Sequence, residues 1–449
     1  MNWRWGAGSA ILVELASSAS ASAQVATPIK SNDYTVEYFQ GPLTAPVRVT
    51  SLGGAYTALA EGIEGAAVNA ASPAVREPFS TRWFDYDVGA ALAFPGAYKH
   101  TDFENRGERR SGGSGSFNNF LYLNLGAQAQ LGAFGMAATV DAQSIQVESS
   151  RRLELQIYRF QGLLAYAFED NQYIFGVGVR AMSMQFTTRI LPVTESSIFH
   201  VQGIAPQMGV LVKPNNAVWR FGATFRAPVS ARPLGDDIVQ SGRDGLRRVD
   251  NFIIPNRVQM PWEFEFGLAI QIGARTLNPP WIDPHAREQA LRAEILREGL
   301  LPEIQAARIA QVSRIVRNEL DNRYDSMPRQ KILLLASLLV AGPTNNAVGI
   351  QSFLDQRREA FGQSMTFSPR VGLEGEPIVD RMKLRVGGYI EPSRFERGTF
   401  RQHFTFGSEV KLIRFNPWGL LGDSPWRISA MVDLAPRFIN WGLSIGHWH

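Results

Sequence analysis

Histidine, serine and aspartate are the residues of this chain that could support catalysis or bind a metal ion. The six histidines are His100, His200, His285, His403, His447 and His449. Only His447 and His449 have a spacing that places both on one face of a strand, and two ligands are fewer than a zinc site needs. The absence of cysteine excludes disulfides and thiolate ligands. We therefore predict no metal site, no catalytic residues, no cofactor and no enzymatic activity.

The glycine- and serine-rich segment GGSGS (112–116) resembles a phosphate-binding loop only in composition. A helix follows such loops, because its N-terminus helps to bind the anion, whereas strand-like segments flank residues 112–116. We expect a surface loop there, and no nucleophile elbow between a strand and a helix elsewhere. The 45 Lys and Arg residues barely exceed the 41 Asp and Glu residues, which gives no indication of nucleic acid binding.

Residues 51–74 read SLGGAYTALAEGIEGAAVNAASPA and form an unusual segment. Nearly all of them are small, and only Glu61 and Glu64 are charged. The segment has too much Gly and Ala for a conventional core, and it is too apolar for a solvated linker. It must therefore pack against elements formed by the rest of the chain.

From residue 81 onwards, polar and apolar residues alternate with the period of two that is typical of strands. In 120–131 one face carries Leu121, Leu123, Leu125, Ala127, Ala129 and Leu131. In 260–273 the polar face carries Glu263, Glu265, Gly267 and Gln271. The predicted strands are 81–97, 117–131, 134–148, 153–168, 172–189, 198–213, 217–230, 258–273, 330–342, 366–376, 381–392, 402–413, 426–434 and 438–448. The segment 331–342 could equally be a helix, and we assign a strand because an even number requires one.

The N-terminus resembles a secretory signal peptide. Arg4 precedes a short apolar stretch, which Glu14 interrupts, and the small residues Ala21-Ser22-Ala23 precede Gln24. The alternative is a disordered tail. We predict a signal peptide over 1–23, an N-terminal segment over 24–80, and a single domain of alternating strands over 81–449. No apolar run is long enough for a membrane-spanning helix.

An exported chain of alternating strands is either a soluble sandwich or propeller, or an outer-membrane barrel. Three features favour the barrel: charges of both signs on the polar faces, short turns that alternate with longer loops, and aromatic residues near strand ends. These aromatic residues are Trp83, Phe84, Tyr173, Trp219, Trp262, Trp426, Trp441 and Trp448. We predict an all-β fold, a 14-stranded antiparallel transmembrane β-barrel in contact with lipid of the bacterial outer membrane.

One segment, residues 283–324, has the period of a helix, and the insertion that contains it ends at about residue 327. Asp283 and Pro284 are typical of a helix start, and Pro302 should separate two helices. Strand parity places this helical insertion on the periplasmic rim. It is either a solvated hairpin that covers the barrel floor or a surface that binds a periplasmic partner.

Residues 51–74 resemble the N-terminal motif of FadL-type outer-membrane transporters and their PorV-like relatives. Gly53, Gly54 and Asn69 match that motif, whereas its Asn-Pro-Ala element is stretched to Asn69–Ala74, with Pro73 in place of its proline. The strand–turn–strand segment 209–229 and the segment 260–270 also resemble the family. The resemblance covers the N-terminal segment and about half of the barrel.

The resemblance implies that the N-terminal segment folds inside the barrel as a plug, with Gly53, Gly54, Asn69 and Pro73 in it. Arg220, Arg226, Glu263, Glu265 and Asp141 would face the lumen, where the first four could pair with each other or with the plug. The implied function is passive transport of a hydrophobic small molecule, such as a long-chain fatty acid.

The alternative function is a structural or secretion component that the barrel anchors and that binds a periplasmic or surface partner through 283–324. The third strand, 134–148, is a candidate for a lateral exit because Ala138 and Ala142 on its lipid side are small. The loop 231–257 could serve as a lid or contact surface in either case.

Overall fold

The computed structural model describes residues 27–39, 41–77, 80–96, 101–106, 116–148, 152–190, 194–235, 239–241, 244–299, 301–329, 331–396, 398–416 and 424–448. The predicted signal peptide, residues 112–115 of the glycine- and serine-rich segment, and His449 lie outside these ranges.

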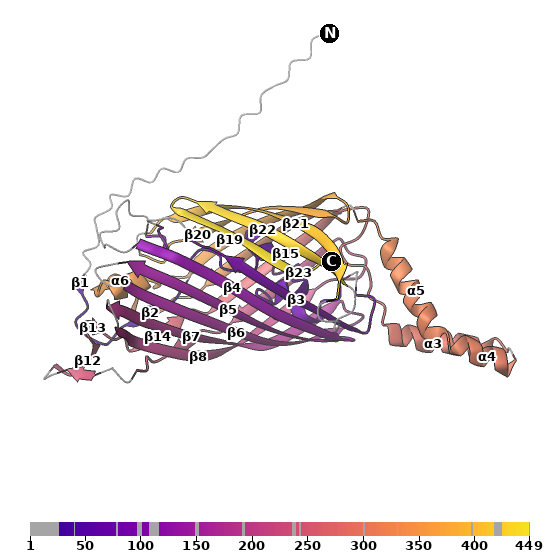
Figure 1. The fold of residues 1–449 in the computed structure, drawn as a ribbon, viewed down its shortest axis with the longest axis horizontal. Coiled ribbons are helices and arrows are strands. Elements are labelled where there is room, and N and C mark those ends of the chain that lie inside the picture. Colours follow the sequence, from indigo (N-terminus) through magenta and orange to yellow (C-terminus); the bar gives the residue numbers. More distant parts are fainter. Residues whose placement is uncertain are drawn as a thin grey trace, which may run out of the picture.

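Fourteen strands form a closed barrel, which confirms the predicted fold class (Figure 1). They are β3 (Phe84–Ala93), β4 (Ser116–Leu131), β5 (Phe134–Glu148), β6 (Arg152–Phe168), β7 (Tyr173–Ile190), β8 (Thr194–Val212), β9 (Trp219–Arg226), β15 (Glu263–Gly273), β16 (Lys331–Ala341), β19 (Thr366–Ile378), β20 (Met382–Pro392), β21 (Phe400–Phe415), β22 (Ser424–Ala435) and β23 (Phe438–His447).

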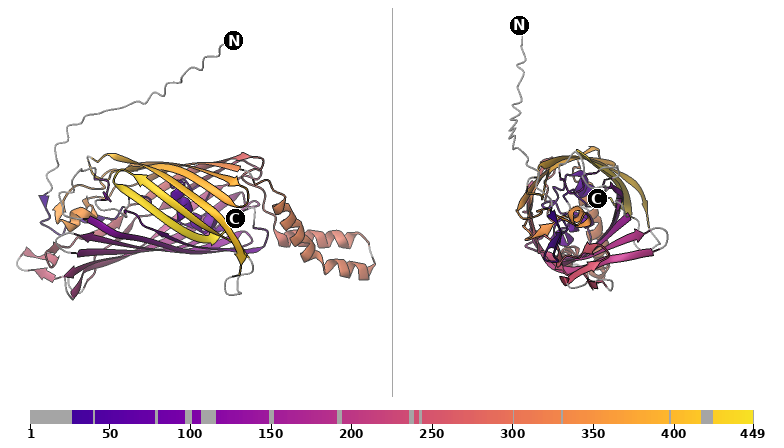
Figure 2. Two further views of the ribbon diagram at one scale, coloured as in Figure 1. Left: turned by 45° about the horizontal axis from the view of Figure 1, so that its top comes forward. Right: turned by 90° about the vertical axis from the view of Figure 1, so that its left-hand side faces the viewer.

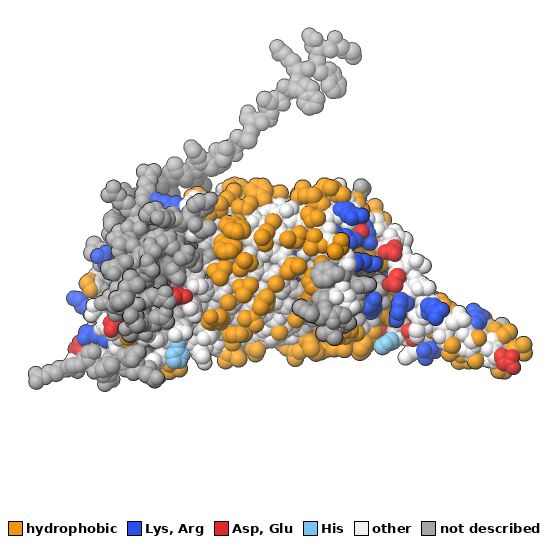
Figure 3. All heavy atoms as spheres, viewed as in Figure 1, with side chains coloured by type: hydrophobic (Ala, Val, Ile, Leu, Met, Phe, Trp, Pro, Cys, Tyr) orange, Lys and Arg blue, Asp and Glu red, His pale blue; other side chains and the backbone are white. Residues whose placement is uncertain are grey.

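The strands bury their polar face and expose their apolar face. In β15, Phe264 and Phe266 are 39% and 37% exposed, whereas Glu265 between them is 1% exposed. On the face shown in Figure 3, hydrophobic side chains are spread over the barrel exterior between its two ends, and charged side chains gather towards the ends. A closed barrel with an apolar exterior satisfies its backbone hydrogen bonds internally and suits a lipid environment. The protein is therefore a β-barrel of the bacterial outer membrane.

The two ends of the barrel differ. We call the end with the turns 132–133, 169–172, 213–218 and 379–381 the turn rim. The opposite end, which we call the loop rim, has short connections at 149–151, 191–193 and 436–437 but also the long connections 94–115, 227–262 and 342–365. Gly132 and the residues from Glu169 to Asn171 adopt positive φ in the turns of the turn rim, which reverses the chain within a few residues. Short turns face the periplasm in barrels of this class, so we assign the turn rim to the periplasm.

Two predicted strands, 217–230 and 258–273, extend less far into the barrel than expected. The barrel strand β9 ends at Arg226 and β15 begins at Glu263. Beyond them, β10 (Val229–Ala231) and β14 (Arg257–Met260) pair with each other in a separate sheet at the loop rim. Pro228 and Pro261 lie at the breaks, where the missing N–H ends the hydrogen-bond ladder.

A cap, which we define as the described residues of 27–39, 227–262 and 343–365, covers the loop rim. Its central sheet joins β10 and β14 to β2 (Thr35–Glu37) and β17 (Ala347–Val348). The remaining cap elements are β1 (Thr27–Pro28), β11 (Val239–Ser241), β12 (Leu246–Val249), β13 (Phe252–Ile253), α6 (Ile350–Leu354) and β18 (Arg357–Arg358). The predicted segment 24–80 therefore contains two parts: 27–39 lies in the cap, and 41–77 lies in the lumen (Figure 1).

The helical insertion projects from the turn rim (Figure 2). It contains α3 (Pro284–Arg297), α4 (Pro302–Ile309) and α5 (Val312–Asp325). Asp283 accepts a hydrogen bond from the backbone N–H of His285, and Pro302 begins α4, as predicted. Ile295, Val312, Val316 and Leu320 form a small separate core. Among the described residues, no helix is long and apolar enough to cross a membrane.

Two of the predicted interface aromatics face away from lipid. Trp426 and Trp448 are buried, at 8% and 4% exposure. The Trp426 ring packs against His447, and Trp448 Nε1 donates to Asp380 at 3.1 Å. Both side chains therefore fix the end of the chain to the turn rim. Trp219 and Trp441 stay exposed at the surface.

Candidate functional site: the plugged lumen

Residues 41–77 fill the lumen and form the plug. They contain α1 (Val47–Ser51), α2 (Gly62–Ala66) and the 3-10 helix η1 (Ser72–Ala74), and nearly every residue of the three is buried. The view from the loop rim shows the N-terminal segment inside the ring of strands (Figure 2). Short helices and small side chains let a compact segment fit within the barrel wall.

The glycine pair of the plug lies directly against the wall. Gly53 has φ +61°, and a Cβ there would lie 2.6 Å from the backbone nitrogen of Gly388 in β20. Gly54 has φ +79°. Only glycine adopts such angles readily, and only a residue without a side chain permits this approach. The backbones of the plug and of β20 therefore touch.

Asn69 and Pro73 also fix the plug to the wall. Asn69 Nδ2 donates to the carbonyls of Thr57 and Val210, at 2.9 and 3.2 Å. The carbonyl of Pro73 accepts a hydrogen bond from Gln130 Nε2 at 3.0 Å. Wall side chains and plug amides thus satisfy backbone groups that bulk water does not reach.

The predicted lumen charges pair both with the plug and with one another. Arg220 donates to Glu61 at 2.9 Å and to the carbonyl of Leu59 at 3.0 Å. Arg226 donates to the carbonyl of Val68 at 2.5 Å and lies 3.4 Å from Glu263 and 3.7 Å from Glu265. These contacts connect the wall to the plug.

Asp141 faces the lumen on β5, apart from Arg220. Its Oδ1 accepts hydrogen bonds from Tyr122 and Asn124, at 2.9 and 2.7 Å, and its Oδ2 lies 3.5 Å from Arg159. Asp141 lines a cavity together with Arg226, Glu263 and Glu265. Arg220 does not line that cavity.

A chain of buried ion pairs below α1 was not predicted. Arg48 of the plug lies 3.1 Å from Glu374, and Glu374 lies 2.6 Å from Arg385. The chain continues from Arg385 to Glu409 at 2.8 Å, from Glu409 to Arg427 at 2.9 Å, and from Arg427 to Glu64 of the plug at 2.6 Å. The charged residues at alternate positions of the sequences of β19–β22 could have indicated that these strands carry ion pairs in the lumen.

His403 lies in a second buried network. Its Nδ1 is 2.8 Å from Asp433, and its Nε2 is 2.7 Å from Glu391. Tyr389 donates to Asp433 and accepts a hydrogen bond from the backbone N–H of Leu43 in the plug. The network therefore holds the first residues of the plug, and it was not predicted.

A cavity of about 150 Å³ lies between the plug and the cap. Its charged lining comprises four arginines (Arg159, Arg180, Arg226 and Arg370) and three acids (Asp141, Glu263 and Glu265). The lining therefore carries one positive charge in excess. Apolar residues from both the plug and the wall, such as Leu43 and Leu339, line the same cavity.

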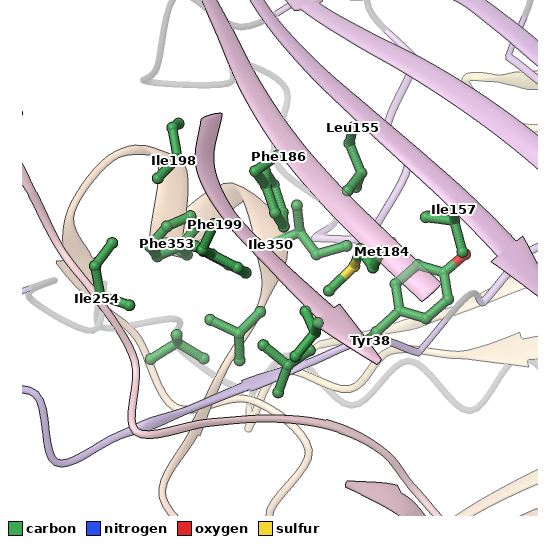
Figure 4. Close-up of a cluster of buried hydrophobic side chains, with 14 of the residues drawn as sticks. Tyr38, Leu155, Ile157, Met184, Phe186, Ile198, Phe199, Ile254, Ile350 and Phe353 are labelled. Carbon is green, nitrogen blue, oxygen red and sulfur yellow. The ribbon is translucent and has the colours of Figure 1, made fainter. Parts of the chain in front are cut away.

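A cluster of buried hydrophobic side chains, which we call the cap cluster and which Figure 4 shows in part, adjoins this cavity. Its members come from β5–β8, from the cap and, with Phe103, from the loop that follows β3, and they include Ile157, Met184, Phe186, Phe199, Ile254, Ile350 and Phe353. Tyr38, Met182 and Val229 belong to the cap cluster and also line the cavity. An apolar region thus passes directly into a polar one.

The part of the chain that the structure describes contains no group of three His, Asp or Glu residues suited to a metal ion. Residues 442–446 do carry the Gly-x-Ser-x-Gly pattern, which the sequence-based expectation passed over. Ser444, however, lies within the continuous strand β23, whereas a nucleophile elbow lies between a strand and a helix.

Comparisons with known proteins agree with this architecture. The sequence matches no family model and no curated protein. The crystal structure of a Pseudomonas aeruginosa FadL homologue is similar, with a TM-score of 0.50 and 11% identity over 92% of this chain and 99% of that one. A TodX deltaS2S3 mutant, a monoaromatic hydrocarbon channel, has a TM-score of 0.51 and 13% identity over 90% of this chain and 98% of that one. The chain therefore has the FadL-type fold.

Proposed function

We propose that the protein is a passive outer-membrane channel for hydrophobic compounds that carry an acidic head group, such as long-chain fatty acids. One observation carries this proposal: the apolar cap cluster passes directly into a cavity with an excess of arginine. An apolar tail suits the cap cluster, and a carboxylate suits the arginines of the adjoining cavity. The similarity to a monoaromatic hydrocarbon channel supports the hydrophobic character of the ligand, and the acidic head group rests on the arginines alone.

Passage would require the plug to rearrange. The cavity ends on plug residues, among them Leu43, Ala45 and Val68. A ligand in the cavity would compete for Arg226, which holds the Val68 carbonyl and two acids. Such competition would loosen the plug from β9 and open the path beyond it.

The test is uptake of labelled long-chain fatty acid by cells that produce the full chain or a chain lacking residues 42–75. Barrel insertion is first confirmed by heat-modifiable migration on a gel. We expect saturable uptake with the full chain and altered uptake after the deletion. Labelled toluene serves as a comparison ligand without an acidic group. Uptake no higher than that of the empty vector for either ligand would contradict transport.

A second candidate is a barrel-anchored structural or secretion component. The specific observation is an exposed set of apolar side chains on the helical insertion: Leu296, Leu301, Ile304 and Ile315 are 58%, 69%, 46% and 43% exposed. Exposed apolar groups of this kind occur at sites of protein contact. Photo-crosslinkers placed at Leu301 and, as a control, at the barrel residue Phe264 would distinguish a specific periplasmic partner from contacts with lipid.

A further inference from the structure

The turn rim contains a second cavity, separate from the one below the cap. Its volume is about 40 Å³, which exceeds the space that a single water needs. The plug forms one side through Arg48, Glu61 and Glu77, and the base of the helical insertion forms another through Tyr324 and Met327. We call it the turn-rim cavity.

Cations outnumber acids around this cavity. The cations are Arg48, Arg275, Arg329, Lys331 and Lys383, and the acids are Glu61, Glu77 and Glu376. Three of the cations have acidic partners elsewhere: Arg48 pairs with Glu374, Arg329 with Asp380, and Lys383 with Glu409. Glu61 is likewise held by Arg220 at 2.9 Å.

Arg275 and Lys331 differ from the other three cations. Neither has an ion-pair partner within 4.0 Å among the described residues, and both are half-buried. The Nε atom of Arg275 is buried and makes no hydrogen bond within the described part of the chain. Lys331 pairs with Gly273 at the end of the β15–β16 ladder, two residues before Arg275. Two cations without an ion pair among the described residues therefore line one small cavity, Lys331 from the start of β16 and Arg275 from the segment that follows β15.

A buried donor without a partner costs free energy, and so does a cation removed from water. Native proteins compensate such groups with a bound ion or with water. An oxyanion supplies acceptor atoms for Arg275 and Lys331, with which the acids of the same lining, Glu61, Glu77 and Glu376, form no ion pair within 4.0 Å. We propose that the turn-rim cavity is a binding site for an oxyanion, either a carboxylate or a phosphate, with Arg275 and Lys331 as its principal ligands.

In this proposal the base of the helical insertion covers the anion site. Tyr324 and Met327 close the cavity from the periplasmic side, so the base of the insertion covers the bound anion. A carboxylate that has passed the plug and a free phosphate from the periplasm have the same chemistry here. The site itself does not depend on the proposed transport function, because the cavity and its two cations, which form no ion pair within the described residues, are present whatever crosses the lumen.

The test is isothermal titration calorimetry on the purified full chain in a neutral detergent, at constant ionic strength maintained with chloride. The probes are inorganic phosphate, acetate and octanoate. We expect Arg275→Gln and Lys331→Gln to weaken binding of the preferred anion at least tenfold each, since each removes a charge-assisted hydrogen bond. Arg317→Gln, at an exposed arginine of α5, should change affinity less than twofold.

The probes separate the sources of the anion. If octanoate binds more tightly than acetate, the site binds the head group of an apolar ligand. If phosphate binds and the two carboxylates do not, the site binds a free oxyanion. Arg275→Lys should retain part of the affinity, which excludes misfolding as the cause of loss. Wild-type protein that binds none of the three probes, or Gln variants that bind as wild type does, would overturn the proposal. Uptake in cells is measured separately, so failure of either proposal leaves the other intact.

Discussion

At the scale of single residues, buried ion pairs attach the plug to the wall. Arg220 is 1% exposed and meets both Glu61 and the carbonyl of Leu59. Alternation along the strand predicts that Arg220 and Arg226 face inward. Their partners in the plug could not be predicted, because residues 51–74 show no period that fixes which carbonyl meets which strand.

Arg220→Gln should destabilise the folded protein by about 3 kcal/mol, because it leaves buried acceptors without their charged donor. The measurement is the temperature at which the folded band on a gel converts to the unfolded band. Glu61→Gln combined with Arg220→Gln should cost less than the sum of the two single changes. Equal transition temperatures for wild type and Arg220→Gln would contradict the role of this pair.

The buried carboxyl of Glu104 should make the stability of the cap depend on pH. Its Oε1 accepts a hydrogen bond from the backbone N–H of Ile350 at the start of α6, at 2.6 Å. Burial raises the pKa of the Glu104 carboxyl to about 7. The folded state therefore binds a proton between pH 7 and about 4.5 that the unfolded state has released, and stability rises as the pH falls through this window.

Hydrogen exchange of the α6 amides, corrected for intrinsic rates, measures this effect. We expect protection at pH 5 to exceed protection at pH 8 by about tenfold or more. The neutral variant Glu104→Gln should show no such difference. A flat profile for the wild type would show that Glu104 does not control the cap.

At the scale of elements, the existence of every barrel strand could be predicted from the sequence, whereas the residues at which the strands end could not. All fourteen barrel strands have a predicted counterpart, including β16, which its apolar sequence left open to a helix. The segments around Pro228 and Pro261 leave the wall because the cap sheet offers another partner, β2. That partner lies more than 200 residues away in the chain, and alternation carries no information about such pairing.

Gly53→Ala should displace the plug from the wall, because the added methyl group would lie 2.6 Å from the backbone nitrogen of Gly388. Residue 53 also has a φ of +61°, which alanine adopts only with strain. Gly299→Ala is a matched control, since it has φ +65° and nothing within 4 Å. Both variants carry the backbone strain of a positive φ, of order 1 kcal/mol. The conductance of the protein in a planar bilayer should be higher for Gly53→Ala than for wild type, and it should be unchanged for Gly299→Ala. Equal conductance of the two variants would show that the contact with β20 does not hold the plug.

Val316→Asp should unfold the helical insertion without opening the barrel. Val316 is 1% exposed in a core that the insertion forms by itself, and an unpaired buried carboxylate is costly. Trypsin should then cleave between residues 283 and 329, while the barrel keeps its heat-modifiable migration. Arg317→Gln, on the exposed face of the same helix, should resist cleavage as wild type does. Loss of the folded barrel band in Val316→Asp would show that the insertion supports the barrel.

At the scale of the whole molecule, the wall closes independently of the plug. The fourteen wall strands pair with one another in a closed order that includes no plug residue. The chain without residues 42–75 should therefore still insert as a barrel, with a lumen open to water. We expect ion conductance well above that of the full chain in a planar bilayer. A deletion variant that inserts but does not conduct would show that the cap closes the lumen by itself.

The path of residues 27–77 also determines the order in which the molecule can assemble. The described part of the chain begins in the cap, passes through the ring and joins the wall at β3. A ring that has already closed cannot admit this thread without unpairing β2 at one end or β3 at the other. The seam between β3 and β23 has five residue pairs, fewer than the six between β8 and β9. The plug is therefore held at both ends, by β2 in the cap and by β3 in the wall, and it can leave the lumen only if one of these two strands unpairs.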